Sequence, residues 1–395
     1  MDLTDVFRNL SETPGLDADL LGRIEKWLGE APDEEVFRIN LVEWSSRHGV
    51  PVEKAVEHFL HLTLAGVFDI SWDSHCPQCN VVLGRDGSLR SVGAVHHCKF
   101  CIKDVECRMD DHFEVTFGVN PQVRQVRGRV QYEPSDNVEI FLRQKVQAGG
   151  EVRAKMNVPA SVRNLRFVAW PPVIVQAIQT APGADRTVIF HGGESARFPE
   201  RFPTGETEFP VRNDGRQEMT LMVENHDMRE YLPEERKPRL TGLQVITVPA
   251  FRELFATETL SARESLKVRD VTLVFTDIKG STELYQRVGD VQAYNLVRDH
   301  FDILFDAIGK NSGTVVKTIG DAVMASFLTP DAAVKAMLDA QTAFVRFNQR
   351  TDIPSSVMIR AGIHKGPAVV VTLNGRLDYF GTTVNEAARI EGQCL

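Results

Sequence analysis

The chain has 395 residues, of which 43% are hydrophobic and 25% are charged, as in globular proteins of two to four domains. These proportions exclude a disordered chain, a collagen-like repeat and a disulfide-rich mini-protein. Residues 1–75 hold 15 acidic and 6 basic side chains, so they carry the whole net charge of −9, and the other 39 acids and 39 bases cancel. Because an acidic surface repels phosphates, we expect no nucleic-acid binding.

Hydrophobic stretches are too short for a membrane helix, which needs about 18 apolar residues. The longest candidate, residues 167–178, is interrupted by Pro171 and Pro172. The N-terminus reads MDLTDVF and lacks the basic start of a signal peptide. We therefore expect a cytoplasmic protein without membrane contact, in which the six cysteines are metal ligands and not disulfides.

Residues 1–72 are predicted to form a helical, winged-helix-like domain. Apolar residues recur at helical spacing in residues 33–48 and again in residues 52–65, on either side of the break at Gly49 and Pro51. A short strand-like run, residues 67–71, follows. Such domains bind DNA or dock proteins, and the acidic charge disfavours DNA. An unknown protein or ligand is the expected partner.

Residues 73–107 are predicted to form a zinc ribbon. Two CxxC pairs are separated by eighteen residues, and each pair places two thiolates toward one tetrahedral ion. The four predicted ligands are Cys76, Cys79, Cys98 and Cys101. Four thiolates leave no open coordination position, so the zinc would be structural. Buried, unrelated thiols or a redox pair are the alternatives, and the substitute ligands would be His75, His96, His97 and Cys107.

Residues 108–248 alternate in short apolar and polar steps between turns, which favours an antiparallel β-sandwich-like region. The expected strands are residues 114–119, 137–144, 151–158, 165–170, 173–178, 186–192, 218–225 and 243–248. No catalytic spacing of His, Asp or Glu stands out, so the region is expected to be a sensory or docking domain, or structural support. Residues 249–266 are predicted to form a helical connector that couples these domains to the C-terminal one.

The C-terminal segment contains a pattern typical of a site that binds a metal-bound polyphosphate. A buried strand, residues 271–276, ends in Asp277 before a small-residue turn and a helix. Backbone N–H groups of such a turn face an anion, and the carboxylate anchors a cation. The turn consists of Ile278, Lys279, Gly280, Ser281 and Thr282.

Two further motifs follow. Asp321 lies at the tip of a predicted hairpin, where an aspartate after a glycine commonly only stabilises the turn. Together with Asp277, however, it could hold two cations about 3.5–4 Å apart. Asn385 and Arg389 lie four residues apart on a helix that begins near Thr383, and therefore on one face. Alone, this pair is typical of a solvent-exposed helix face. The guanidinium of Arg389, however, would also suit the negative charge that develops on a pentavalent phosphate.

Together these motifs resemble the class III nucleotidyl cyclase catalytic domain. FTDIKGST is similar to that family's first metal motif, KTIGDAV to its second, and DYFGTTVNEAAR to its substrate motif. The resemblance covers residues 267–395 and implies a ferredoxin-like α/β fold. The whole chain is thus expected to be a multidomain α+β protein.

The resemblance also implies roles for single residues. Asp277 and Asp321 would bind two Mg²⁺ or Mn²⁺ ions, with the Ile278 carbonyl as a further ligand. Lys317 and Asp378 would read adenine, because adenylate-forming members carry Lys and Asp there and guanylate cyclases carry Glu and Cys. ATP would be the substrate, and cyclic AMP and pyrophosphate the products.

In the same family Asn385 would orient the ribose and Arg389 would stabilise the α-phosphate. Each site is shared between two chains, so a homodimer is implied. Family members continue beyond Leu395 with a helix, a strand pair and a triphosphate-binding lysine, so we expect a fragment or a natural truncation. The alternatives are a guanylate cyclase, a nucleotide-binding pseudo-cyclase and a zinc-ribbon scaffold.

Overall fold

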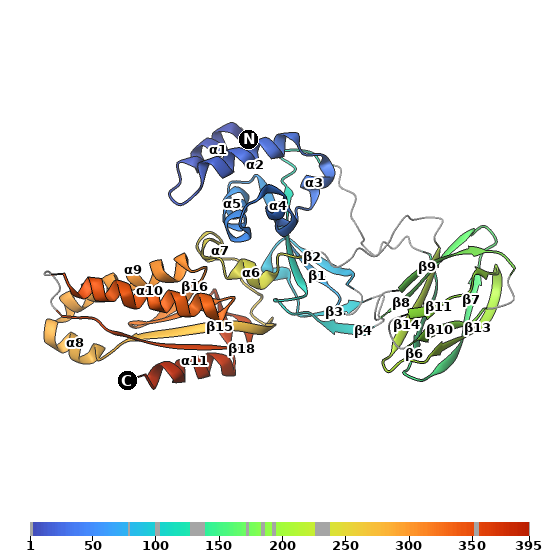
Figure 1. Cartoon of the computed structure of the whole chain (residues 1–395). Coiled ribbons are helices and arrows are strands. Elements are labelled where there is room, and N and C mark those ends of the chain that lie inside the picture. Colours follow the sequence, from blue (N-terminus) through green and yellow to red (C-terminus); the bar gives the residue numbers. More distant parts are fainter. Residues whose placement is uncertain are drawn as a thin grey trace.

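The computed structural model describes most of the chain. The described residues are 3–77, 80–98, 103–126, 139–170, 174–182, 186–191, 195–225, 238–350 and 355–394. Three bodies are seen in Figure 1: an N-terminal module of helices and a small sheet, a β-sandwich, and a C-terminal α/β domain. In the described residues, no helix combines the length and hydrophobicity needed to cross a membrane.

Five helices open the N-terminal module, and their ends follow from local capping. They are α1 (Leu3–Ser11), α2 (Ala18–Glu30), α3 (Asp33–Phe37), α4 (Leu41–His48) and α5 (Val52–Leu64). The Asp17 carboxylate caps α2 and the Asn40 amide caps α4, while Gly49 ends α4 with a left-handed φ of 63°. The two predicted helical patterns are therefore confirmed, with the first divided into α3 and α4. The winged-helix assignment stays a prediction.

A small antiparallel sheet joins these helices to the cysteine segment. Its strands and the adjoining elements are β1 (Phe68–His75), β2 (Val82–Asp86), η1 (Leu89–Ser91), β3 (Val95–Cys98), β4 (Lys103–Glu106) and β5 (Phe113–Val119). The strand order is β2-β1-β5, and β3 and β4 form a separate hairpin. Strand β1 crosses the predicted boundary at residues 72/73 and pairs with β5, which lies beyond the predicted boundary at residues 107/108. Buried apolar residues of α2 to α5, β1 and β5 lie in one cluster, which extends into the C-terminal sheet.

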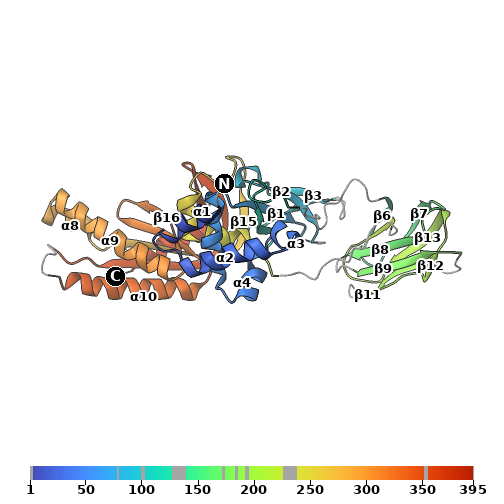
Figure 2. The ribbon, with the colours of Figure 1, turned by 90° about the horizontal axis from the view of Figure 1, so that it is seen from above.

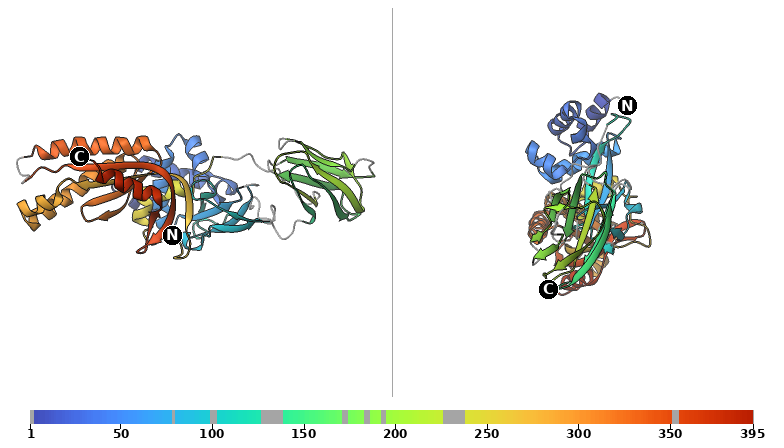
Figure 3. Two further views of the ribbon diagram at one scale, coloured as in Figure 1. Left: turned by 90° about the horizontal axis from the view of Figure 1, so that it is seen from below. Right: turned by 90° about the vertical axis from the view of Figure 1, so that its right-hand side faces the viewer.

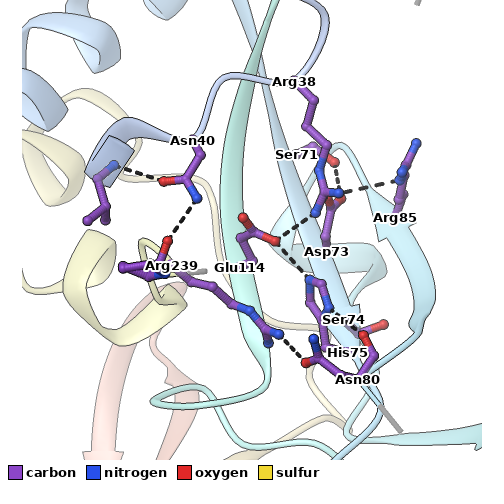
Figure 4. A network of polar contacts seen from close by, with 12 residues as sticks. Arg38, Asn40, Ser71, Asp73, Ser74, His75, Asn80, Arg85, Glu114 and Arg239 are labelled. Carbon is purple, nitrogen blue, oxygen red and sulfur yellow. Dashed lines mark hydrogen bonds and ion pairs between the residues drawn. The ribbon is translucent and has the colours of Figure 1, made fainter. Parts of the chain in front are cut away.

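A buried polar network crosslinks this module (Figure 4). Arg38 donates to the Glu114 carboxylate at 2.7 Å and lies 2.8 Å from Asp73, while His75 bonds Glu114 at 2.9 Å. Burial alone would raise the pKa of Glu114, but the bond from His75 and the charge of Arg38 lower it below its ordinary value. Arg239, which follows the sandwich in the sequence, donates a hydrogen bond to the Asn80 side chain. Its opposite charges are paired across β1 and β5, which indicates a structural role.

The β-sandwich is inserted between β5 and the chain's return at residue 238. Its strands are β6 (Ile140–Val146), β7 (Glu151–Val158), β8 (Asn164–Trp170), β9 (Ile174–Thr180), β10 (Val188–His191), β11 (Ser195–Arg197), β12 (Arg201–Phe202), β13 (Gly205–Asn213) and β14 (Met219–Asn225). They form sheets of order β11-β10-β13-β7 and β12-β9-β8-β14-β6 around a core that includes Phe167, Phe202 and Phe209. Most pairs are antiparallel, as expected. Figures 2 and 3 show the two layers from other sides.

Two predicted elements before the C-terminal domain are corrected. Residues 243–248, expected as a strand, form helix α6 (Gly242–Ile246), because Thr241 and Gln244 build a capping box. The expected helix over 249–266 is confined to α7 (Pro249–Leu254). The rest is irregular, since its Thr and Ser residues favour turns and Glu258 instead bonds Ser88 and the Leu89 amide.

The C-terminal domain is a five-stranded antiparallel sheet of order β16-β17-β15-β18-β19. Its elements are β15 (Leu266–Ile278), α8 (Ser281–Val288), α9 (Asp290–Lys310), β16 (Thr314–Ile319), β17 (Ala322–Phe327), α10 (Pro330–Asn348), β18 (Ile359–Leu373), β19 (Arg376–Phe380) and α11 (Thr382–Gly392). Helices α9 and α10 cover one face and α11 the other (Figure 1). The predicted hairpin around Asp321 and the helix near Thr383 are both present.

Helix α11 lies unusually close to the sheet. A Cβ at Gly362 of β18 would come within 2.3 Å of the Glu391 amide nitrogen and 2.5 Å of the Ala387 carbonyl oxygen. A Cβ at Gly366 would come within 2.7 Å of the Thr383 hydroxyl. Glycine therefore sets the depth of α11, with Thr383 and Ala387 buried underneath it.

Candidate functional site

The first predicted ligand, Asp277, lies at the end of β15 beside a cation. Its register partner on β18 is Arg360, and the Arg360 guanidinium donates to the Asp277 Oδ2 at 2.6 Å. The same guanidinium forms an ion pair with Glu391 of α11, with an N–O distance of 3.1 Å. Cross-strand pairing thus places a fixed positive charge beside the predicted metal ligand.

Asp321 shares its neighbours with Asp277. It follows Gly320, whose φ of 64° forms the hairpin tip, and its buried Oδ2 has no hydrogen-bond partner among the described residues. Burial and the charges of Asp321 and Asp277 raise the pKa of Tyr285 on α8. Burial raises the pKa of Glu391, and both aspartates add to the rise while Arg360 opposes it. The structure therefore brings the two predicted ligands into one place.

The donor set of this place, which we call the metal end, fits a divalent cation. Asp277, Asp321 and Glu391 supply carboxylate oxygens, which Mg²⁺ and Mn²⁺ prefer. The orphaned oxygen of Asp321 is an acceptor that a cation would satisfy. Within the described residues no group of three His, Cys, Asp or Glu side chains is already arranged to hold a metal. The carboxylates are thus gathered, with Arg360 balancing part of their charge.

The predicted phosphate turn connects β15 to α8. Gly280 adopts φ 69° at the N-cap of α8, a left-handed conformation that favours glycine. No side chain caps the helix at this residue, so the first-turn N–H groups of Ser281 and Thr282 can donate hydrogen bonds to an anion. Lys279 is exposed beside them, and Ile278 is the buried last residue of β15.

Lys317 and Asp378, predicted to read the purine, are in direct contact. They come from the edge strands β16 and β19, and the Lys317 ammonium donates to the Asp378 Oδ2 at 2.5 Å. The Asp378 Oδ1 accepts from the Tyr379 amide at 2.8 Å. Asp378 is 5% exposed, so its carboxylate is held in one orientation by two donors. We call this pair the purine end.

Asn385 and Arg389 lie on the exposed face of α11, opposite the buried Thr383 and Ala387. The prediction that they share one helical face is confirmed. Neither makes a hydrogen bond or ion pair with Asp277 or Asp321 in the described part of the chain. One chain therefore does not assemble all the predicted residues.

Three residues of the metal end were not singled out from the sequence: Arg360, Glu391 and Tyr285. Arg360 becomes recognisable only when the β15–β18 register is known, because it lies 83 residues from Asp277. Glu391 lies two positions after the predicted Arg389, but reaches the other face through the close packing of α11.

Of the predicted zinc ligands, Cys79 and Cys101 lie outside the described residues. Cys76 and Cys98 are both buried, and they share one cluster with Val168 and Met222 of the sandwich. Sandwich strands β8 and β14 therefore pack against the cysteine segment.

Two family models match the chain. Residues 264–394 match the adenylate and guanylate cyclase catalytic domain. Residues 2–151 match a family of unknown function, DUF5939. The C-terminal domain therefore belongs to the adenylate and guanylate cyclase catalytic domain family, which confirms the resemblance drawn from its three motifs.

Similar proteins carry both cyclase names. The adenylate cyclase of Anabaena cylindrica is 32% identical over 137 residues, which are 31% of this chain and 27% of that protein. Retinal guanylyl cyclase 1 of Rattus norvegicus is 38% identical over 138 residues, 32% of this chain and 12% of that protein. The catalytic core of a rhodopsin-guanylyl cyclase with converted specificity, in complex with ATPalphaS, is 28% identical, covers 33% of this chain and 76% of that one, and has a TM-score of 0.31. The chain thus spans about a quarter or less of these two curated relatives.

Proposed function

We propose that the C-terminal domain is an adenylate cyclase that converts ATP into 3′,5′-cyclic AMP and pyrophosphate. The contact between Lys317 and Asp378 carries this proposal. Adenine presents a ring-nitrogen acceptor beside an amine donor, which an ammonium and a carboxylate match. Guanine presents the opposite order of donor and acceptor along the same edge, so this pair opposes GTP.

The remaining residues suit the cyclisation step. The ribose O3′ attacks the α-phosphorus, the new O3′–P bond forms as the bond to pyrophosphate breaks, and the hydroxyl proton passes to solvent water. Arg389 would stabilise charge on the α-phosphoryl oxygens, and Asn385 would hold the ribose. The turn at residues 278–282 would receive the polyphosphate. Two Mg²⁺ or Mn²⁺ ions, bound by Asp277, Asp321 and the Ile278 carbonyl, would lower the pKa of the hydroxyl and neutralise the phosphates.

The proposal is tested by cyclic-nucleotide formation with Mn²⁺ and either ATP or GTP. We expect cyclic AMP from ATP, and its loss in Asp277→Ala and in Arg389→Ala. Cyclic GMP from GTP as the only product would favour a guanylate cyclase, the alternative that the similarity to retinal guanylyl cyclase 1 keeps open. Nucleotide binding without any product would identify a pseudo-cyclase.

A homodimer would complete the site. Its support is that Asn385 and Arg389 are exposed and do not contact the aspartates of their own chain. Mixing the inactive Asp277→Ala and Arg389→Ala chains tests this directly. Half of the mixed dimers would be heterodimers with one intact site, so about a quarter of the wild-type activity should return. A mixture that stays inactive, while both variants still dimerise, would contradict a shared site.

The cysteine segment would bind one structural zinc through Cys76, Cys79, Cys98 and Cys101. The CxxC spacing and the common burial of Cys76 and Cys98 support this. Elemental analysis of the purified chain should give one zinc per chain, lost in Cys76→Ser and kept in Cys394→Ser. A zinc-free, folded wild type would contradict it.

A further inference from the structure

Helix α7 lies between the N-terminal module and strand β19. The Phe251 ring of α7 meets the buried Trp72 ring of β1 edge-on, with centroids 5.7 Å apart. Phe251 also stacks on Phe255 at 5.5 Å. One side of α7 is therefore anchored in the N-terminal core, and the cluster that contains Phe251 extends to Leu377 and Tyr379 of β19.

Arg252, which follows Phe251 in α7, contacts β19 directly. Its Nη1 donates to the Leu377 carbonyl at 2.8 Å, and its guanidinium carbon lies 5.8 Å from the centre of the Tyr379 ring. Its Nε donates to the Ile246 carbonyl of α6 at 3.2 Å. Three contacts thus fix the guanidinium between the end of α6 and the two residues that flank Asp378.

The strand's alternation connects these contacts to the purine end. Leu377 and Tyr379 point to the core face of β19, so Asp378 between them points to the opposite face, toward Lys317. Because β19 is the last strand of the described sheet and pairs only with β18 there, its position depends on what supports its core face. That support is α7.

We propose that Arg252 is a positioning residue for purine recognition: it fixes the backbone around Asp378 and makes base selectivity depend on the seating of α7 against the N-terminal module. This rests on the proposed adenylate cyclase function, and it adds a residue outside the three motifs. Arg252 touches no nucleotide. It acts by holding the Asp378 carboxylate at the distance that favours adenine over guanine.

The link to the N-terminal module has two further anchors in the same connector. The Glu258 carboxylate accepts from the Ser88 hydroxyl and the Leu89 amide, each at 2.9 Å. The Leu260 carbonyl accepts from the Thr372 hydroxyl of β18 at 2.8 Å. The connector is thus bonded to the module on one side and to the β18–β19 hairpin on the other.

The test measures kcat and KM for ATP and for GTP on the full chain, with Arg252→Ala, Arg252→Lys and the control Arg263→Ala. Arg263 is exposed on the same connector. Loss of a charge-assisted hydrogen bond should lower the ATP-to-GTP ratio of kcat/KM about tenfold in Arg252→Ala, mainly through the KM for ATP. Arg252→Lys should restore part of it, and Arg263→Ala should match the wild type. Equilibrium binding of fluorescent ATP and GTP analogues should show the same shift.

Two results distinguish a failure of the Arg252 inference from a failure of the proposed adenylate cyclase function. If the wild type prefers ATP and the folded Arg252 variants keep its ratio while losing only kcat or thermal stability, Arg252 is merely structural and the inference is overturned. If the wild type neither binds nor converts ATP in preference to GTP, the proposed function fails and the inference falls with it. Thermal unfolding of each variant distinguishes a misfolded chain, and Arg252→Lys then decides the outcome.

Discussion

The metal end and the purine end of the C-terminal domain are built in opposite ways. At the metal end, the Arg360 guanidinium pairs with Asp277 and Glu391, and a buried oxygen of Asp321 and one of Glu391 have no hydrogen bond within the described residues. At the purine end, one carboxylate is buried with an ammonium and a backbone amide as donors. The purine end is preorganised by the chain itself, whereas the metal end has unbalanced negative charge that added cations would neutralise.

The difference also concerns what supports each end. The purine end rests on α7 and through it on the N-terminal module, by the Phe251–Trp72 contact. The metal end rests on α11 and on α8 and α9, and the cluster that contains the buried residues of α8 and α9 belongs to the C-terminal domain alone. Signals from the N-terminal module are therefore expected to act on nucleotide affinity before they act on metal binding.

The largest expected effect is at the metal end. Asp321→Asn removes one of the gathered charges without changing size, and should lower the rate of cyclic-nucleotide formation by about a thousandfold or more. The matched control is Asp306→Asn, an exposed aspartate of α9 that pairs with Lys310. Near-wild-type activity of Asp321→Asn at saturating Mn²⁺ would show that this carboxylate only stabilises the hairpin turn and binds no catalytic metal.

The second effect is at the purine end. The double variant Lys317→Glu with Asp378→Cys reverses donor and acceptor, and should shift the ATP-to-GTP ratio of kcat/KM toward GTP by about a hundredfold or more. Mn²⁺ affinity, measured by calorimetry, should not change. A variant that loses both activities equally and binds Mn²⁺ more weakly would break the distinction between the two ends.

How far the sequence predicts this site depends on the range of each interaction. Asp277, the turn at 278–282 and Asp321 are recognisable because each lies at the end of a short local pattern, a strand before a helix or a hairpin tip. Arg360 and Glu391 are not, because their roles arise from strand register and helix depth. The same holds for Arg252, whose partner Leu377 lies 125 residues later in the chain.

The fold shows the same limit. Alternation identified most sandwich strands, such as β7, because one face of each is buried. It failed at residues 243–248, where a capping box outweighs β-branched side chains. It also could not show that β5 leaves the sandwich and pairs with β1, since strand pairing depends on partners that are distant in sequence.

A third, smaller effect tests the depth of α11 at the metal end. Gly362→Ala would push a methyl group against the backbone at Glu391, so we expect a loss of about 1–3 kcal/mol in unfolding free energy. Gly309→Ala in α9 is the matched control, because its Cβ would meet nothing within 4 Å and alanine favours helix. Urea unfolding followed by circular dichroism measures both. Equal stability of the two variants would show that α11 moves away freely.

The last effect, and the smallest near neutral pH, is a pH dependence confined to the metal end. His300 of α9 is fully buried beside Phe301 and Phe344, and burial lowers its pKa to about 4. An unfolded histidine titrates near 6.5, so between these values the unfolded chain binds a proton that the folded chain does not. The contribution of the buried, neutral His300 to the free energy of unfolding is fully present above about pH 6.5. It is lost as the pH falls toward 4, by up to about 1.4 kcal/mol per pH unit.

Hydrogen exchange, corrected for its intrinsic pH dependence, can locate this loss. In the wild type, amides of α9 should lose protection between pH 6.5 and 4.5, while those of β19 at the purine end keep theirs. His300→Leu should remove the decline, whereas His191→Leu, at an exposed position of β10, should leave it unchanged. If α9 and β19 lose protection together, the two ends unfold as one cooperative unit, and their independence, on which the separate control of nucleotide and metal depends, would have to be abandoned.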